Sequence, residues 1–312
     1  MKKIMTMGEI LVEIMATEIG QSFRRPGTLV GPYPSGAPAI FIDQVGKLGQ
    51  ACGIIGCVGD DDFGRLNLDR LSHDGVDVAG ISVMQDAVTG SAFVTYQEDG
   101  SRDFIFNISN SACGKLSAAQ VSEAVLKDCA HFHVMGSSLF SVPIVEAVKK
   151  AIAIVKAHGG TISFDPNVRK ELLSSAEMRG ALRFILGCTD IFLPSGQEIT
   201  LLTDAAGEQE AIAEILAMGV REIVLKRGAD GCSFYDAGLS ISCPAFAAEE
   251  IDPTGAGDCF GASYVTCRLQ HMPVDAALRY ANASGALAIS RKGPMEGSSS
   301  FAELDAFLTR QA

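Results

Sequence analysis

Strand-like and helix-like segments alternate regularly from residue 117 onward. Short apolar runs with few breaks favour buried strands, and longer runs with apolar residues at every third or fourth position favour helices. The predicted helices are 118–127, 144–157, 178–186 and 208–218, and the predicted strands are 131–135, 161–164, 191–193, 222–226 and 232–235. Strands joined by helices imply right-handed crossovers and a parallel sheet covered on both faces. The pattern therefore predicts a doubly wound, mostly parallel α/β sheet flanked by helices.

The first third of the chain is less regular. It predicts strands at 4–7, 10–15, 52–58, 81–83 and 90–97, and helices at 39–48 and 65–72. Residues 16–35 are rich in Gly, Pro, Arg and short polar residues, which is too irregular for a helix. A loop of this length inside a compact domain is usually functional.

A hairpin interrupts this alternation. Residues 91–96 and 102–106 flank Glu98-Asp99-Gly100-Ser101, a sequence typical of a hairpin turn. Such a hairpin predicts a small sheet that projects from the main one. Because no linker or repeat divides the chain, we predict one domain over 1–312, with the small sheet inserted at about 10–35 and 88–110.

Composition narrows the function classes. Hydrophobic residues make up 47% of the 312 residues and charged residues 20%, which excludes a disordered protein. The net charge of −12 argues against nucleic-acid and acidic-membrane partners. A phosphate-bearing ligand must then be held by local geometry.

The cysteines and the N-terminus indicate a compartment. Nine cysteines form an odd set without a C-x-x-C pair, so neither a disulfide framework nor a zinc ribbon is predicted. The N-terminus becomes acidic at Glu9, before any signal-peptide core, and no run of 18 apolar residues follows. We predict reduced, mostly buried thiols and a cytoplasmic protein.

The stretch 252–260 carries the candidate chemistry. Gly255, Ala256 and Gly257 precede an apolar, proline-free segment, Asp258 to Leu269, which predicts a buried helix. Free N–H groups and the helix dipole make such a helix start an anion site. A carboxylate there is placed to take a proton from a hydroxyl while the amides stabilise a group being transferred. This arrangement suggests phosphoryl transfer to an alcohol.

Other interpretations of this stretch remain. Asp258 can be a helix-capping acid, with the glycines making only a tight turn. A dinucleotide fingerprint is excluded because G-x-G-x-x-G requires Gly where Phe260 stands, and no G-x-x-x-x-G-K-[ST] loop occurs in the chain.

The nine residues Asp252-Pro253-Thr254-Gly255-Ala256-Gly257-Asp258-Cys259-Phe260 match D-[TP]-T-G-A-G-D-x-F. The chain thereby resembles the ribokinase-like (PfkB) carbohydrate kinases, and further landmarks of that family recur in order over nearly its whole length. The resemblance implies a ribokinase-like fold with a β lid, and transfer of phosphate from ATP, with Mg²⁺, to a sugar hydroxyl. It assigns Asp258 as catalytic base and Gly255, Ala256 and Gly257 as the anion hole. It also implies a homodimer through the lid.

On the sugar side, the segment from Ser35 to Ile40 is similar to the family's G-G-x-x-A-N, which makes Gly36 and Ala37 substrate-binding candidates. Ser35 replaces a Gly, and Ile40 replaces the Asn that contacts substrate. Glu13 stands where the family commonly has an Asp that binds sugar hydroxyls. For all of these, ordinary turn and surface roles are the alternative.

The string Asp165-Pro166-Asn167-Val168-Arg169 resembles the D-P-N-x-R landmark of the fructokinase and 2-keto-3-deoxygluconate kinase branch. In that branch the Asp and Asn face the phosphate path and the Arg can reach the substrate. With the segment from Gly8 to Glu13, it suggests a ketohexose kinase, tagatose or fructose first, acting on a primary hydroxyl. A sugar-acid kinase such as one for 2-keto-3-deoxygluconate is the alternative, and a nucleoside kinase is less favoured.

The nucleotide and metal candidates come mainly from the same resemblance. Glu198 aligns with the family's N-x-x-E acid, which helps hold Mg²⁺ through water, although Ser195 replaces the Asn. The ATP-binding candidates are Lys226, Gly228, Gly231, Thr254, Gly257 and Asn282. The candidates for a monovalent cation such as K⁺ are Asp252, Ser290 and Gly293. A plain turn at 228–231 and tight helix packing around Asn282 are the alternatives.

Some motifs carry no function in this interpretation. Asp62-Phe63-Gly64 spells a protein-kinase triplet without its companion motifs, and we interpret it as a turn. His131 and His133 share one strand face without a third metal ligand, which favours a structural role. Cys259 has no activating His. A catalytically idle sugar sensor and a nicotinamide enzyme are the competing classes; the intact Asp258 motif disfavours the first and Phe260 the second.

Overall fold

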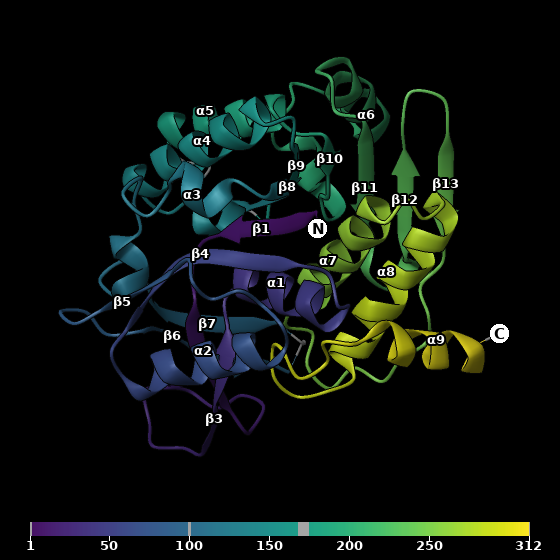
Figure 1. Cartoon of the computed structure of the whole chain (residues 1–312). Coiled ribbons are helices and arrows are strands. Elements are labelled where there is room, and N and C mark those ends of the chain that lie inside the picture. The colour runs from purple at the N-terminus through teal and green to yellow at the C-terminus, as the bar shows by residue number, and fades with distance from the viewer. Residues whose placement is uncertain (1, 99–100, 168–174, 312) are drawn as a thin grey trace.

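The main sheet of this computed structural model runs through the centre of the molecule (Figure 1). The structure describes residues 2–98, 101–167 and 175–311. In these residues the sheet has nine strands in the order β13-β12-β11-β10-β9-β8-β1-β4-β5. Their bounds are β1 Lys3–Met7, β4 Cys52–Gly59, β5 Ile81–Met84, β8 Cys129–Met135, β9 Thr161–Asp165, β10 Ile191–Phe192, β11 Glu222–Lys226, β12 Cys232–Tyr235 and β13 Ser240–Cys243.

Parallel pairing runs from β5 to β11, and only β12 and β13 pair antiparallel at the end of the sheet. The chain leaves β1 for β4 on one side and later fills β8 on the other. Ligands of such sheets bind where the strand order reverses, beyond the carboxyl ends of the strands. The predicted doubly wound sheet is confirmed, and it points to the region beyond Met7.

Helices cover both faces of this sheet (Figure 1). One apolar core lies under α4, α5 and α6, and another lies under α1, α7 and α8. The bounds are α1 Ala37–Lys47, α2 Asp62–His73, α3 Glu123–Leu126, α4 Val142–Ala157, α5 Ala176–Gly187, α6 Glu208–Ala217, α7 Ala256–Leu269, α8 Val274–Ile289 and α9 Phe301–Arg310. The α7 helix is buried along nearly all of its length, as the apolar run after Asp258 predicts.

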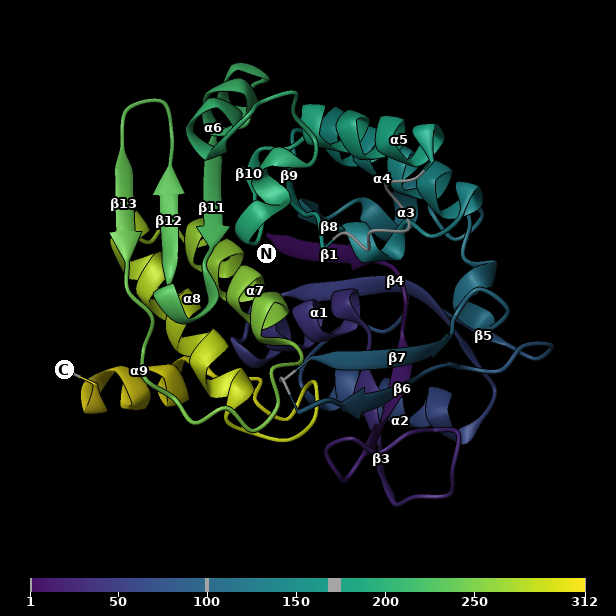
Figure 2. The ribbon, with the colours of Figure 1, turned by 180° about the vertical axis from the view of Figure 1, so that it is seen from behind.

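A second, four-stranded sheet lies beside the main one (Figure 2). Its order is β3-β2-β6-β7, with bounds β2 Leu11–Ala16, β3 Leu29–Ser35, β6 Gly90–Tyr96 and β7 Arg102–Asn107. The β2 strand follows β1 after three residues, so the small sheet begins at the carboxyl end of β1. The two inserts predicted at about 10–35 and 88–110 supply all four strands.

Some element predictions were wrong. Residues 29–35 form a strand inside the segment predicted as irregular, because β2 offers them an antiparallel partner. The predicted helix 118–127 is helical only over Glu123–Leu126. Ser117 bonds Gln120 in a turn, and Ser122 caps the short helix through the Val125 amide.

The histidines and cysteines take structural roles. His131 and His133 are buried and share the Ser163 hydroxyl, at 2.7 and 2.8 Å, and His133 stacks on Phe41. All nine cysteines are free thiols, buried or half-buried. No helix among the described residues has the length and apolar character to cross a membrane.

Candidate active site

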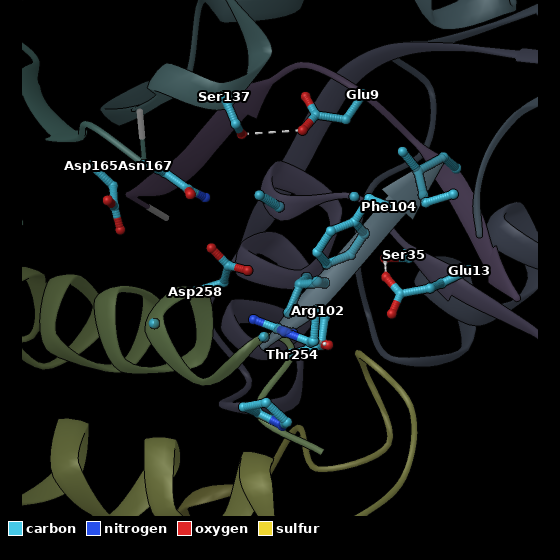
Figure 3. A pocket seen from close by; sticks show the side chains of 18 of the residues that line it. Glu9, Glu13, Ser35, Arg102, Phe104, Ser137, Asp165, Asn167, Thr254 and Asp258 are labelled. Carbon is cyan, nitrogen blue, oxygen red and sulfur yellow. Dashed lines mark hydrogen bonds between the residues drawn. The ribbon is translucent and has the colours of Figure 1, made fainter. Parts of the chain in front are cut away.

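A cavity of about 580 Å³ lies between the two sheets and the start of α7 (Figure 3). Residues from the carboxyl ends of main-sheet strands line one side, and residues of the small sheet line the other. Its predicted lining residues are Glu13, Gly36, Ala37, Glu198, Lys226, Thr254, Gly255, Gly257 and Asp258. The sequence motifs, although scattered from residue 13 to residue 258, therefore meet in one place.

The first turn of α7 presents uncapped amides to this cavity. Gly255 is the N-cap, in a left-handed conformation with φ of 84°, and no side chain caps the turn in the described structure. A Cβ at position 255 would lie 2.5 Å from the Pro294 carbonyl oxygen, so only Gly fits. The Cys259 amide bonds the Gly255 carbonyl, whereas the preceding amides lack a helical acceptor. Uncapped amides at a helix start can bind an anion.

Asp258 lies in the same turn with its carboxyl group at the cavity wall (Figure 3). The residue is only 8% exposed. Burial raises the pKa of Asp258 to about 8, the carboxylates of Asp165 and Glu9 also raise it, and the Lys226 ammonium lowers it. A carboxyl group titrating near neutral pH suits a general base.

Asp165 and Lys226 form a buried ion pair next to this base. Asp165 ends β9 and Lys226 ends β11, so the sheet holds both at its carboxyl edge. The Lys226 ammonium lies 3.5 Å from the point where a Cβ of Gly257 would stand. The Lys226 ammonium of this pair therefore lies beside the first turn of α7, where an anion would bind.

Glu13 and Glu9 also line the cavity. The Ser35 hydroxyl donates to Glu13 Oε2 at 3.2 Å, while the buried Oε1 has no partner in the part of the chain that the structure describes. Burial, followed by the charge of Asp252, raises the pKa of Glu13 to about 7. Ser35, Arg102 and Thr254 lower the same pKa, but their effect is smaller. Ser137 and Ser138 donate to the carboxylate of Glu9. Glu13 thus presents an acceptor into the cavity.

The metal candidates are engaged inside the protein. Glu198 accepts from the Ser195 amide at 2.8 Å in a capping box of the short helix Gly196–Thr200, and it also lines the cavity. The two carboxylate oxygens of Asp252 accept from the amides of Thr254 and Gly293, at 3.0 and 3.1 Å. The Ser290 hydroxyl bonds the Leu287 carbonyl. Asp252 and Gly293 are in contact, as a shared cation site would require.

Some predicted site residues do not line the cavity: Ala256, Gly228, Gly231 and Asn282, and the cation candidates Asp252, Ser290 and Gly293. Arg169 lies outside the described residues, so its predicted role is not tested. Asn282 donates to the carbonyls of Cys243 and Pro244, and Gly231 passes so close to the Cys243 carbonyl that no Cβ fits. Gly231 and Asn282 thus meet at the β12–β13 edge, away from Asp258.

Sequence reasoning missed two prominent cavity residues, Arg102 and Phe104. Both come from β7, where alternate side chains face the cavity (Figure 3). The Arg102 guanidinium carbon lies 5.5 Å from the Phe104 ring centroid, and Nη1 donates to the Thr254 hydroxyl at 2.7 Å. Their period-two spacing was visible in the sequence, but it did not say which face of the hairpin would meet α7.

Comparisons with known proteins agree with this geometry. The model of the pfkB family carbohydrate kinases matches residues 1–300. Fructokinase-1 of Oryza sativa subsp. japonica is 31% identical over 299 residues, covering 93% of this chain and 92% of its own.

Two solved structures extend the likeness. A protein of E. coli described as a ribokinase II, in complex with ATP and Mg²⁺, is 58% identical with a TM-score of 0.97, covering 99% of this chain and 100% of its own. A double mutant of the Vibrio cholerae O395 fructokinase, with fructose, ADP and potassium bound, is 27% identical with a TM-score of 0.86, covering 99% and 98%.

Proposed function

This chain belongs to the pfkB family of carbohydrate kinases, and from that premise we propose that it transfers the γ-phosphoryl group of ATP to a primary hydroxyl of a ketohexose, fructose or tagatose. One observation carries the proposal. The carboxyl group of Asp258 and the uncapped amides of its own helix turn face the same cavity as Glu13, whose carboxylate can accept hydrogen bonds from sugar hydroxyls.

The residues suggest a sequence of roles. Glu13 and the backbone at Gly36 and Ala37 orient the sugar, so that one hydroxyl reaches Asp258. Asp258 removes the proton of that hydroxyl as the oxygen attacks the γ-phosphorus and the bond to the leaving ADP oxygen breaks. The amides of Gly255, Ala256 and Gly257 stabilise the charge on the transferring oxygens.

The charges in the cavity favour a neutral sugar. Among the described lining residues, Glu9, Glu13, Asp165, Glu198 and Asp258 carry carboxylates, whereas Arg102 and Lys226 are the cations. Lys226 is already paired with Asp165. A sugar acid would add an anion to this excess, while hydroxyls can donate to the carboxylates. We therefore rank 2-keto-3-deoxygluconate below the ketohexoses.

ATP and two cations complete the proposal. Gly228, Gly231 and Asn282, at the β12–β13 edge, are the candidates for the nucleoside part of ATP, and Lys226, Thr254 and Gly257 for its phosphates. Glu198, a carboxylate facing the cavity, is the donor for Mg²⁺ through water, and bound Mg²⁺ would neutralise phosphate charge. The contact between Asp252 and Gly293 is the candidate site for a monovalent cation, and the similar Vibrio cholerae fructokinase structure contains a potassium ion.

An ADP-release screen tests this function. Wild-type protein with MgATP is offered D-fructose, D-tagatose, D-ribose, 2-keto-3-deoxygluconate and adenosine, and we expect the highest kcat/KM for a ketohexose. Asp258→Asn should lower kcat by about 10² or more, because a general base contributes about 10²–10⁴-fold, with little change in sugar affinity.

The outcomes separate the parts of the proposal. Turnover of ribose or the sugar acid alone would refute the ketohexose, and near-normal turnover by Asp258→Asn would refute the base. Binding of sugar without ADP release in any reaction would instead identify a sensor.

A further inference from the structure

Arg102 connects the small sheet to the start of α7, where the uncapped amides lie. Its Nη1 donates to the Thr254 hydroxyl at 2.7 Å, across 152 positions in the sequence. Thr254 directly precedes Gly255, the N-cap of α7, and its own amide is held by Asp252. The contact therefore ends one residue from the amides that face the cavity (Figure 3).

Arg102 brings a positive charge into the cavity, where it lowers the pKa of the neighbouring Glu13 carboxyl group. Among the described residues, no carboxylate lies close enough to form an ion pair with Arg102, whereas the cavity's other cation, Lys226, is bound to Asp165. The Phe104 ring centroid lies 5.5 Å from the guanidinium carbon, within reach of a cation–π contact. Arg102 has five N–H donors and uses one on Thr254, which leaves donors for an anion.

We propose that Arg102 is a positioning residue for the terminal phosphate of the nucleotide, acting through Thr254. The hydrogen bond fixes the residue before the N-cap, and the guanidinium adds positive charge on the sugar-facing side of the amides. Because Arg102 belongs to the sheet that covers the sugar side, it makes the phosphate site depend on the position of that sheet. This inference rests on the proposed function, since it takes the anion to be the γ-phosphate of ATP.

A double-mutant cycle on nucleotide binding tests the contact without any sugar. Arg102→Gln, Thr254→Val and the double variant are titrated with the Mg²⁺ complex of AMP-PNP by calorimetry. A hydrogen bond to a charged group is worth about one to two decades of affinity, so each single variant should bind roughly tenfold more weakly. The double variant should be no weaker than Arg102→Gln, because both changes remove one interaction.

Two further measurements distinguish positioning from a structural effect. ADP, which lacks the γ-phosphate, should lose less affinity than AMP-PNP in Arg102→Gln. The control Asp103→Ala, next to Arg102 on β7, removes the hydrogen bond that the Gln97 side chain donates to Asp103, and it should bind both nucleotides like the wild type.

The results separate this inference from the proposed function. Additive losses in the double variant, or equal losses for ADP and AMP-PNP, would overturn the role of Arg102. A wild type that turns over no ketohexose would refute the proposed substrate. The cycle would still report on the contact between Arg102 and Thr254, because it measures nucleotide binding without a sugar.

Discussion

At the scale of single residues, the proposed role of Asp258 as the base depends on its charge state. Its pKa of about 8 results first from burial, which disfavours the ionised form, and then from the charge of Asp165. The ionised form is the one that accepts a proton. Activity limited by this group must therefore rise with pH through the neutral range, rather than stay flat as it would for an exposed Asp.

Asp165→Asn should move this rise to lower pH. The substitution removes a carboxylate that raises the Asp258 pKa and frees Lys226, which lowers it, so both effects have the same sign. We expect the midpoint of log(kcat/KM) against pH to fall by on the order of one unit. The profile is measured from pH 5.5 to 9.5 with the substrate found in the screen.

Glu9→Gln is the matched comparison. Glu9 is the weakest contributor to the Asp258 pKa, so its removal should shift the midpoint less in the same direction. A midpoint that stays in place in Asp165→Asn would mean that another group limits the reaction.

The sequence predicts the site residues unevenly. Asp258 and Gly255 stand in a dense motif whose spacing is tied to a helix start, so local rules suffice to find them. Arg102 carries no local signature, because its contact with Thr254 forms only when the small sheet meets the start of α7, 152 positions away in the sequence. Glu198 shows the reverse case, since a Glu three residues after Ser195 is a local helix-start signature, and the structure has a capping box there, beside the cavity.

At the scale of elements, the start of α7 is fixed by a backbone that only Gly adopts. Gly255→Ala would force a side chain into φ of 84° and set its Cβ 2.5 Å from the Pro294 carbonyl. The displaced amides should then lower kcat/KM for ATP by about 10²-fold, the usual effect of losing one oxyanion donor.

Gly219→Ala provides the control for this prediction. Gly219 has φ of 104° with open space around it, so the strain is similar and no contact is lost. We expect activity close to the wild type and a Tm lower by about 4 °C or less, in a thermal melt run beside the ATP kinetics. Equal kinetic damage in both variants would show that general strain, not the anion site, explains the effect.

Element prediction followed periodicity closely where the core is continuous. The helices α4, α5 and α6 and the parallel strands between them were found because each buries one apolar face. The β3 strand was missed because only its last two residues are buried, so its sequence shows no alternation of apolar and polar positions, and it becomes a strand by pairing with β2. Residues 118–122 gave the opposite error, because they were predicted as helix and are not helical. The side chain of Ser117 bonds Gln120 in a turn, and the short helix begins only after its N-cap Ser122.

At the scale of the whole molecule, the cavity exists only where two sheets meet. The main sheet supplies Asp165 and Lys226 at its carboxyl edge, α7 supplies Asp258, and the small sheet supplies Glu13 and Arg102. Neither sheet alone encloses this cavity. The small sheet must therefore be held in place, and its edge strand β7 has no further strand beside it in the described structure.

That uncovered edge predicts a dimer. The β7 strand ends the small sheet, and Phe104, Ile105 and Phe106 are 37%, 50% and 39% exposed. An exposed apolar edge strand is a template for pairing with another chain. We expect sedimentation velocity to give a homodimer at micromolar concentration, formed through this edge.

Ile105→Asp should dissociate this dimer without entering the site. Ile105 pairs with Phe93 and faces away from the cavity, whereas Phe104 and Phe106 line it. The monomer should keep its nucleotide affinity but show a raised KM for sugar, because the partner no longer supports the small sheet over the sugar side. Leu239→Asp, an exposed apolar residue at the β12–β13 turn, should leave both mass and KM unchanged. A monomeric wild type, or an Ile105→Asp dimer of unchanged mass, would show that the edge of β7 is not the interface.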